Sequence, residues 1–419
     1  MTLLILFVFL GAAALAMPIA HAILLAALAA AVSNDRIPFD LLVQQMVAQV
    51  QSFPLIAIPF FMLTGSLMMG GKLGQAIVGT LSALVGRWHG GPAQVSVLSS
   101  TLFGGVSGSA VADASAIGSL VMPWHRKLGY PMPFSAASLA SSATIDIIIP
   151  PSIPLILYAM SANESIGALF YAGILPGLML CGGFMAACWW VGKRDNLPRE
   201  SAPADRAVFR RNLLYSLPAI ALPILIIVFL RFGIATPTEV AVLSTLFAGA
   251  VSLLVYRDLS IKRLHHAVLE AGLATGVVLM VIMASAAIGW LLTFDQMPQL
   301  IVQWVQQNVN EKWAVIMLMN AMMLFLGMFI DLPAAVLLLT PVFLPLAQAI
   351  GMDTVQLGIM MVVNLAIGLY TPPVGTTLFI ASSLAKVKVG QTVRAMGPFY
   401  LVAFGVLLLV SYVPAVILK

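Results

Sequence analysis

The sequence predicts an all-α polytopic membrane protein with inverted structural repeats, two re-entrant helical hairpins and two broken helices. Three observations predict it: scarce charge, long apolar runs, and an internal repeat of the residues that shape the backbone. Of 419 residues, 61% are hydrophobic and 8% are charged, against about a quarter charged in soluble domains. So few charges cannot cover a water-facing surface, which excludes a soluble enzyme. At about 20 residues per transmembrane helix, the chain could form about ten or more membrane segments.

The distribution of basic residues fits a membrane protein and does not indicate nucleic-acid binding. The formal net charge is +5, but the basic residues lie in loops between apolar runs. The apolar start, residues 1–32, has no basic residues before its apolar core. We therefore expect it to be membrane-embedded structure and not a cleaved signal peptide.

Apolar runs follow one another along the whole chain, separated by short polar loops. The only long polar loop is 193–211. Two segments, 71–87 and 296–312, are amphipathic and are expected to lie along the membrane interface. The apolar runs span approximately 2–32 (broken near Pro18), 54–70, 91–124, 131–162, 165–192, 212–230, 237–256, 267–293, 313–350, 354–385 and 397–417.

Four of these runs are interrupted midway. Runs 91–124 and 313–350 carry glycine and polar residues at their centres and are long enough to fold back as hairpins. Runs 131–162 and 354–385 each contain a double proline, which removes N–H donors and disfavours helix just before it. The carbonyls freed at mid-membrane must then find protein, water or an ion.

An internal repeat relates the interrupted runs. Shifting the sequence by 222 positions superimposes residues that dictate backbone shape, which gene-duplicated halves explain better than coincidence. The matched pairs are Gly105 and Gly327, Pro123 and Pro345, Gly129 and Gly351, Pro150-Pro151 and Pro372-Pro373, Ser161 and Ser383, and Pro176 and Pro398.

Loop charge gives the orientation of the two halves. Loop 193–211 holds six basic residues and should therefore be cytoplasmic. Counting crossings from this loop places both ends of run 91–124 on the cytoplasmic side and both ends of run 313–350 outside. The two hairpins should enter from opposite faces, so the repeats are inverted.

The interruptions predict binding sites near the bilayer midplane. Half-helices should begin there after Ser109, Asp331, Ser152 and Thr371, each a competent N-cap. Helix N-termini favour a carboxylate, whereas exposed carbonyls, hydroxyls and Asp331 are donors for an alkali cation. The candidate substrate ligands are Ser107, Gly108, Ser109, Ser152 and Thr376, and the candidate cation ligands are Ser109, Ile149, Pro150, Asp331, Thr371, Pro372 and Gly375.

Three segments of this sequence resemble the large membrane subunit (DctM type) of tripartite ATP-independent periplasmic (TRAP) transporters. They are residues 104–115, 149–154 and 370–377, and the similarity covers essentially the whole chain. The resemblance implies an elevator-type ion-transporter fold and sodium-coupled uptake of an organic acid, such as a C4-dicarboxylate, sialic acid or another sugar acid. Na⁺ would be the coupling ion, with no organic cofactor. Because each of the two hairpin tips faces a double-proline break whose carbonyls complete an oxygen cage, we expect at least two sodium sites.

The resemblance also implies partners and a location. A small four-helix membrane subunit (DctQ type) and a periplasmic substrate-binding protein (DctP type) should accompany this chain in the lipid of the bacterial inner membrane. Since Met1 opens directly on the first apolar run, the small subunit is expected to be a separate chain.

The predicted halves divide the chain into alternating scaffold and transport segments. The transport halves each hold one hairpin and one broken helix, and the scaffold segments hold the interfacial helices and loop 193–211. The scaffold segments are 1–90, 163–312 and 386–419, and the transport halves are 91–162 and 313–385.

Other interpretations compete with this one. A stand-alone cation-coupled carrier of the divalent-anion or arsenite class has the same hairpin architecture, and a channel suits paired breaks less well. The Gly105-Val-Ser-Gly108 segment matches the nucleophile pattern of intramembrane serine proteases, with His21, His265 and His266 as the only conceivable bases.

The buried acids also allow two interpretations. Asp331 could be a cation ligand, or only a cap for the helix that follows it. For Asp113 and Asp146, a structural hydrogen-bonding role and a substrate role are equally open.

Overall fold

The structure, a computed structural model, describes residues 1–15, 17–34, 37–69, 72–200, 205–309 and 311–417. Within these residues every regular element is helical, as predicted. Residue 71, residues 201–204 of the polar loop and residue 310 belong to predicted segments but lie outside the described residues.

The first helices follow the apolar runs. Proline 18 separates α1 (Thr2–Ala14) from α2 (Ile19–Val32), at the break that the sequence predicts. α3 (Phe39–Val50) and the segment formed by η1 (Phe53–Ile56) and α4 (Ala57–Met69) meet at a bend of 55°. α5 (Lys72–Val85) and α14 (Met297–Asn308) occupy the two amphipathic segments; their place at the membrane interface stays a prediction.

Long apolar helices and shorter pieces build the membrane body. Five helices in the described residues are long and apolar enough to cross a membrane, or seven spans if each of two bent pairs counts as one. Runs 2–32, 91–124, 131–162 and 354–385 are each divided into separate helices. The five are α10 (Ile166–Arg194), α11 (Arg206–Arg231), α12 (Pro237–Ala250) with its continuation η3 (Val251–Val255), α13 (Ile261–Phe294) and α16 (Leu332–Ala349).

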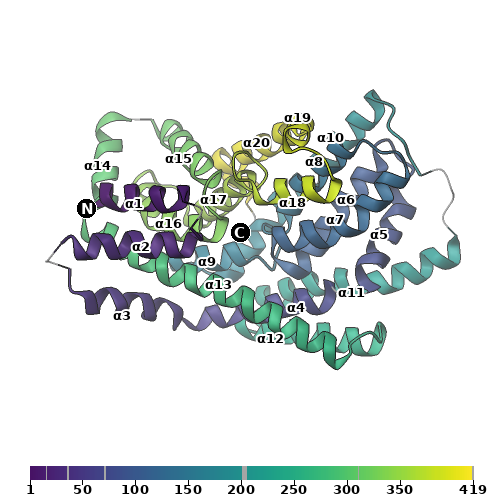
Figure 1. Cartoon of the computed structure of the whole chain (residues 1–419), viewed down its shortest axis with the longest axis horizontal. Coiled ribbons are helices and arrows are strands. Elements are labelled where there is room, and N and C mark those ends of the chain that lie inside the picture. The colour runs from purple at the N-terminus through teal and green to yellow at the C-terminus, as the bar shows by residue number, and fades with distance from the viewer. Residues whose placement is uncertain (16, 35–36, 70–71, 201–204, 310, 418–419) are drawn as a thin grey trace.

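Both predicted hairpins are present. α6 (Gly91–Ser107) and α7 (Ala110–Lys127) form the first, and α15 (Lys312–Gly327) and α16 form the second. Figure 1 places the first hairpin in the right half of the molecule and the second in the left half. The hairpins thus reach the centre from opposite ends.

Both predicted breaks are present as well. In the first half, α8 (Met132–Ser142) and η2 (Ala143–Ile145) are separated from α9 (Ile153–Ala162). In the second, α17 (Thr354–Gly368) is separated from α18 (Thr376–Ala385). The chain ends in α19 (Val389–Ala395) and α20 (Gly397–Tyr412), bent by 59°, and η4 (Pro414–Val416).

One predicted helix start is wrong. We expected a half-helix to begin after Thr371, with Pro372 in its first turn, but α18 begins at Thr376 with Gly375 as its N-cap. Thr371 instead closes the preceding helix, because its hydroxyl donates to the Ile367 carbonyl at 2.6 Å. The other three half-helices begin after Ser109, Asp331 and Ser152, as predicted.

The shift of 222 positions also relates the helix bounds. It carries the bounds of α7 onto those of α16, and the left-handed Gly129 (φ 68°) onto the left-handed Gly351 (φ 63°). Corresponding cis peptide bonds occur at Pro150-Pro151 and Pro372-Pro373. The two halves therefore break at equivalent positions.

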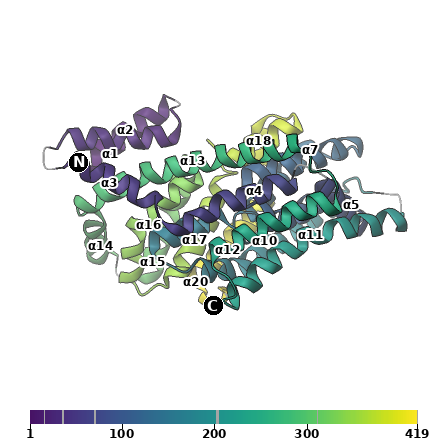
Figure 2. The same ribbon diagram turned by 90° about the horizontal axis from the view of Figure 1, so that it is seen from below.

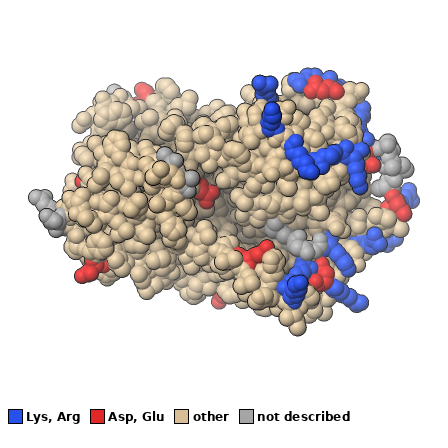
Figure 3. Space-filling view, viewed as in Figure 1, with Lys and Arg blue, Asp and Glu red and all other residues tan. Residues whose placement is uncertain are grey.

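The hairpins and breaks lie beside three helices that pack together. In Figure 2, α4, α12 and α13 run side by side, and α4 packs against both of the others. α13 also packs against α16 of the second hairpin. In the space-filling view of Figure 3, lysine and arginine gather over the right half of the molecule, where the first hairpin lies.

Candidate functional site

The two hairpin tips meet at a cavity of about 280 Å³. Gly108 and Ser109 line it from the first tip, and Asp331 lines it from the second. Val277 and Val278 of α13 form part of its wall. Residues 222 positions apart, Ser109 and Asp331, thus face one space from opposite ends of the molecule.

The first tip turns at a glycine that the structure requires. Gly108 has a left-handed backbone, φ 64°, a conformation that residues other than glycine rarely adopt. A Cβ at this position would lie 2.6 Å from the Pro151 carbonyl oxygen. The tip therefore packs directly on the first double-proline break.

The carboxylate of Asp146 holds the first tip closed. It accepts hydrogen bonds from the Ser107 hydroxyl at 3.1 Å and from the backbone amides of Gly108 and Ser109, each at 3.0 Å. Asp146 is fully buried. Three donors to one buried carboxylate fix the shape of the turn, so Asp146 has the structural role that the sequence left open.

These bonds determine which tip groups can meet a ligand. In this conformation the Ser107 hydroxyl and the Gly108 and Ser109 amides already bind Asp146. The N-terminus of α7 also presents Ala110 and Val111, which line the cavity. Their amides belong to the first turn, where helical N–H groups have no intrahelical acceptor. A carboxylate in the cavity would face these amides.

Asp331 stands at the N-cap of α16, but its side chain makes no capping hydrogen bond. Pro333 occupies the first turn of α16. By contrast, Ser109 and Ser152 accept bonds from the Ala112 and Leu155 amides, at 3.5 Å and 3.2 Å. Asp331 thus lacks the capping bond that Ser109 and Ser152 make, and its backbone partner is the Leu332 amide.

The first break is internally satisfied. The Ser152 hydroxyl is buried and donates to the Ile147 carbonyl at 2.5 Å. The Ile149 side chain packs on Gly177 of α10, and Pro150 is buried. None of Ser152, Ile149 and Pro150 lines the cavity between the tips; Ile147 does.

The second break contains an unsatisfied hydroxyl. The Thr376 hydroxyl oxygen is buried and has no hydrogen-bond partner. The carbonyl oxygens of Thr371 and Leu369 face Gly375, lying 2.9 Å and 3.2 Å from where its Cβ would be. The Leu369 carbonyl accepts the Thr377 amide and hydroxyl. Thr376 as a substrate ligand, and Thr371 and Gly375 as cation ligands, stay predictions.

The buried acid Asp113 makes no side-chain bond that would brace the hairpin. It is fully buried, and neither of its carboxylate oxygens has a hydrogen-bond partner. It lies close to Asp146 and to the Ser100 hydroxyl.

The structure thus brings together only part of the predicted site. Gly108, Ser109 and Asp331 share one cavity, and Ser107 lies just behind them. Thr371, Pro372, Gly375 and Thr376 are not among the residues lining it, so their role as cation or substrate ligands stays a prediction.

No serine nucleophile is paired with a histidine base at the predicted position. The Ser107 hydroxyl donates to Asp146, whereas the His266 ring lies 3.1 Å from Glu270 on the surface. The arrangement does not support the protease interpretation.

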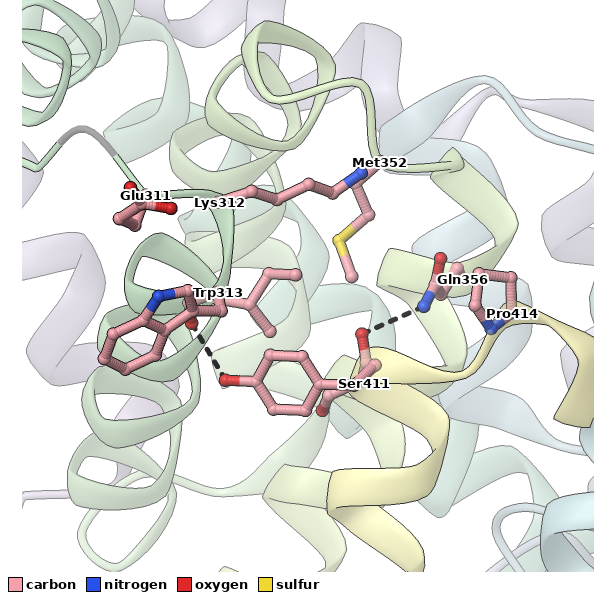
Figure 4. A pocket seen from close by; sticks show the side chains of 9 residues that line it. Glu311, Lys312, Trp313, Met352, Gln356, Ser411 and Pro414 are labelled. Carbon is pink, nitrogen blue, oxygen red and sulfur yellow. Dashed lines mark hydrogen bonds between the residues drawn. The ribbon is translucent and has the colours of Figure 1, made fainter.

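A second cavity, of about 340 Å³, lies between the ends of α15, α17 and α20. Figure 4 shows Gln356, Ser411 and Trp313 around it. Its polar side chains are occupied: Gln356 donates to the Val410 and Ser411 carbonyls, and Lys312 donates to the Gly351 carbonyl. It is the weaker candidate for a ligand site.

Comparison with known proteins agrees with these features. Residues 3–416 match the family model of the tripartite ATP-independent periplasmic transporter, DctM component. The chain is 51% identical to protein y4mL of Sinorhizobium fredii over 418 residues, covering 100% of both chains. It is 36% identical to the 2,3-diketo-L-gulonate TRAP transporter large permease protein YiaN of Escherichia coli over 409 residues, covering 98% of this chain and 96% of YiaN.

A solved structure shares the fold. The crystal structure of the Alcanivorax borkumensis YdaH transporter superimposes with a TM-score of 0.63 at 15% identity, covering 87% of this chain and 86% of YdaH.

Proposed function

Because this chain belongs to the DctM family of TRAP transporter components, we propose that it performs sodium-coupled uptake of an organic acid by an elevator mechanism. The chain is a large permease and not an enzyme. We infer that it works in the bacterial inner membrane with a separate small subunit of DctQ type and a periplasmic binding protein of DctP type.

The cavity between the hairpin tips carries this proposal. Three helices, α7, α9 and α16, begin at the cavity. The partial positive charges of their N-termini favour an anion there without any basic side chain. The substrate carboxylate would bind at the first-turn amides of α7, next to Ser109.

Sodium would be the co-transported ion. Asp331 is a carboxylate in the middle of an apolar chain, where insertion costs about 2.5–3.5 kcal/mol, so a functional role is the default expectation. The free Thr376 hydroxyl and the Thr371 carbonyl supply oxygen donors at the second break. Together these groups support a cation site in the second half of the chain, and Ser109 with the first break would form the site in the first half.

The elevator movement would slide the hairpins and broken helices along a fixed frame. The frame would contain α4, α12 and α13. These helices run side by side, and α4 packs against both of the others. The moving part would contain α6 to α9 and α15 to α18, where the breaks are concentrated.

The first test is sodium-dependent uptake by the chain reconstituted with its small subunit and binding protein. Asp331→Asn removes the charged oxygen donor, whereas Ser109→Ala removes one neutral donor at the equivalent position. We expect Asp331→Asn to raise the sodium concentration for half-maximal uptake by about tenfold or more, since charged donors bind more strongly than neutral ones. Ser109→Ala should raise it less.

Protein amount and folding are checked for both variants. If the sodium concentration for half-maximal uptake is unchanged in Asp331→Asn, the proposal that Asp331 binds the co-transported sodium is wrong. Liposomes with the chain alone serve as the control, and sodium-driven uptake there would favour the stand-alone carrier.

A further inference from the structure

A second polar space lies farther along α13, outside the site described above. It is a cavity of about 270 Å³ between α3 and α13 on one side and α9 and α16 on the other. Ser285 of α13 lines it, is 2% exposed, and has no hydrogen-bond partner for its hydroxyl.

The free hydroxyl of Ser285 is unusual for its position. A serine or threonine inside a helix commonly donates to the carbonyl four residues earlier. Ser244 does so to Val240 at 2.7 Å, and Thr293, on the same helix as Ser285, does so to Gly289 at 2.8 Å. Leaving a buried hydroxyl unpaired costs about 1–3 kcal/mol. The unpaired Ser285 hydroxyl therefore indicates a hydrogen-bonding partner that occupies the cavity.

The chemistry of the cavity is polar and uncharged. The side-chain amides of Gln45 and Gln49 line it together with the Ser161 hydroxyl and the Trp290 ring. Among the described residues that line this cavity there is no acid and no base. Amides and hydroxyls both donate and accept hydrogen bonds, so the cavity suits hydroxyl groups better than it suits a carboxylate or a cation.

The position of the cavity relates it to the hairpin tips. Both spaces border α13 and α16. Val278 lines the tip cavity and Ser285 the outer one, and seven residues of helix separate them by about 10 Å. The two cavities therefore lie about two helical turns apart along α13.

We propose that this outer cavity is a subsite for the uncharged, hydroxyl-rich part of the transported acid, so that the substrate is a polyhydroxy monocarboxylate and not a dicarboxylate. The inference rests on the proposed function. Neither cavity has a lysine, arginine or histidine among its described lining residues. A second carboxylate in the outer cavity would therefore meet neither a basic side chain nor a helix N-terminus, whereas the hydroxyls of a sugar acid would pair with Ser285 and the glutamines.

The test measures binding to the purified full chain with two probes, gluconate and succinate, by ligand-induced shifts in the midpoint of thermal unfolding. Ser285→Ala is compared with Ser244→Ala, a buried helical serine whose hydroxyl is already bonded. Without ligand, Ser285→Ala should be as stable as the wild type or more so, because it removes an unpaired buried hydroxyl.

With gluconate, wild type and Ser244→Ala should be stabilised equally, and Ser285→Ala should need about three- to tenfold more gluconate for the same shift, the range of one neutral hydrogen bond. Succinate should stabilise less, and equally in all three. The inference is overturned if gluconate has no effect, if succinate stabilises as well as gluconate, or if Ser285→Ala responds like the wild type. Binding is measured without transport, so a failure of sodium-driven uptake would count against the proposed function separately.

Discussion

At the scale of single residues, Asp146 organises the first hairpin tip. Its carboxylate joins η2 to three donors at residues 107–109, almost forty positions earlier in the chain. The sequence places an acid one turn before a double proline in an apolar run, which marks it as significant. Its role could not be predicted, because the contact depends on how the hairpin packs on the break.

We predict that Asp146→Ala lowers the free energy of unfolding by about 3 kcal/mol or more, since it removes three hydrogen bonds to one buried carboxyl group and leaves buried donors unpaired. Asp146→Asn should cost less, because its amide oxygen can still accept hydrogen bonds. The measurement is thermal unfolding of the purified chain, with Ser244→Ala as the matched buried variant. Equal unfolding midpoints for Asp146→Ala and Ser244→Ala would show that the tip does not depend on Asp146.

Other residues show where local sequence is insufficient. Ser109 and Ser152 cap their helices as expected, because an N-cap bond reaches only three residues along the chain. Thr371 does not, since its hydroxyl bonds back to α17 and the turn continues to Gly375. The outer cavity at Ser285 was missed, because it is formed by side chains from four separate helices.

At the scale of elements, the hairpins and breaks were predictable from sequence. Glycine and proline act on the backbone locally, so their positions determine where a helix must end. The double prolines at 150–151 and 372–373 both lie in breaks. The close packing of the first tip on the first break was not visible in the sequence, although Gly108 is the residue that permits it.

Two glycines allow this packing to be tested. Gly108 and Gly129 both have left-handed backbones, but a Cβ at Gly108 would meet the Pro151 carbonyl at 2.6 Å, whereas nothing lies within 4 Å at Gly129. Gly129→Ala should lower the free energy of unfolding only by the backbone strain, about 1–2 kcal/mol. Gly108→Ala should lower the free energy of unfolding by clearly more, because its Cβ would also clash with the Pro151 carbonyl, and it should reduce uptake.

The unfolding midpoints and uptake rates of the two variants are compared side by side. If Gly108→Ala is no worse than Gly129→Ala in both measurements, the tip does not need its close contact with the break.

At the scale of the whole molecule, two hairpins from opposite ends converge on one central cavity bordered by α13. The basic residues gather over the end where the first hairpin lies, which is the end that loop charge assigns to the cytoplasm. Scarce charge and the internal repeat predicted this general plan. Neither could predict which residues of the tips and breaks share the cavity.

We propose that the hairpins move past α13 during transport, and cross-linking α7 to α13 tests this movement. Val111 of α7 and Val277 of α13 line the same cavity, and the two native cysteines, Cys181 and Cys188, are buried and can be replaced. A chain carrying cysteines only at 111 and 277 is treated with a short, reducible thiol cross-linker. Each single-cysteine chain is the control.

We expect cross-linking to abolish sodium-driven uptake and reduction to restore it, with the single-cysteine chains unaffected. Uptake at the untreated rate by fully cross-linked protein would contradict a moving hairpin domain.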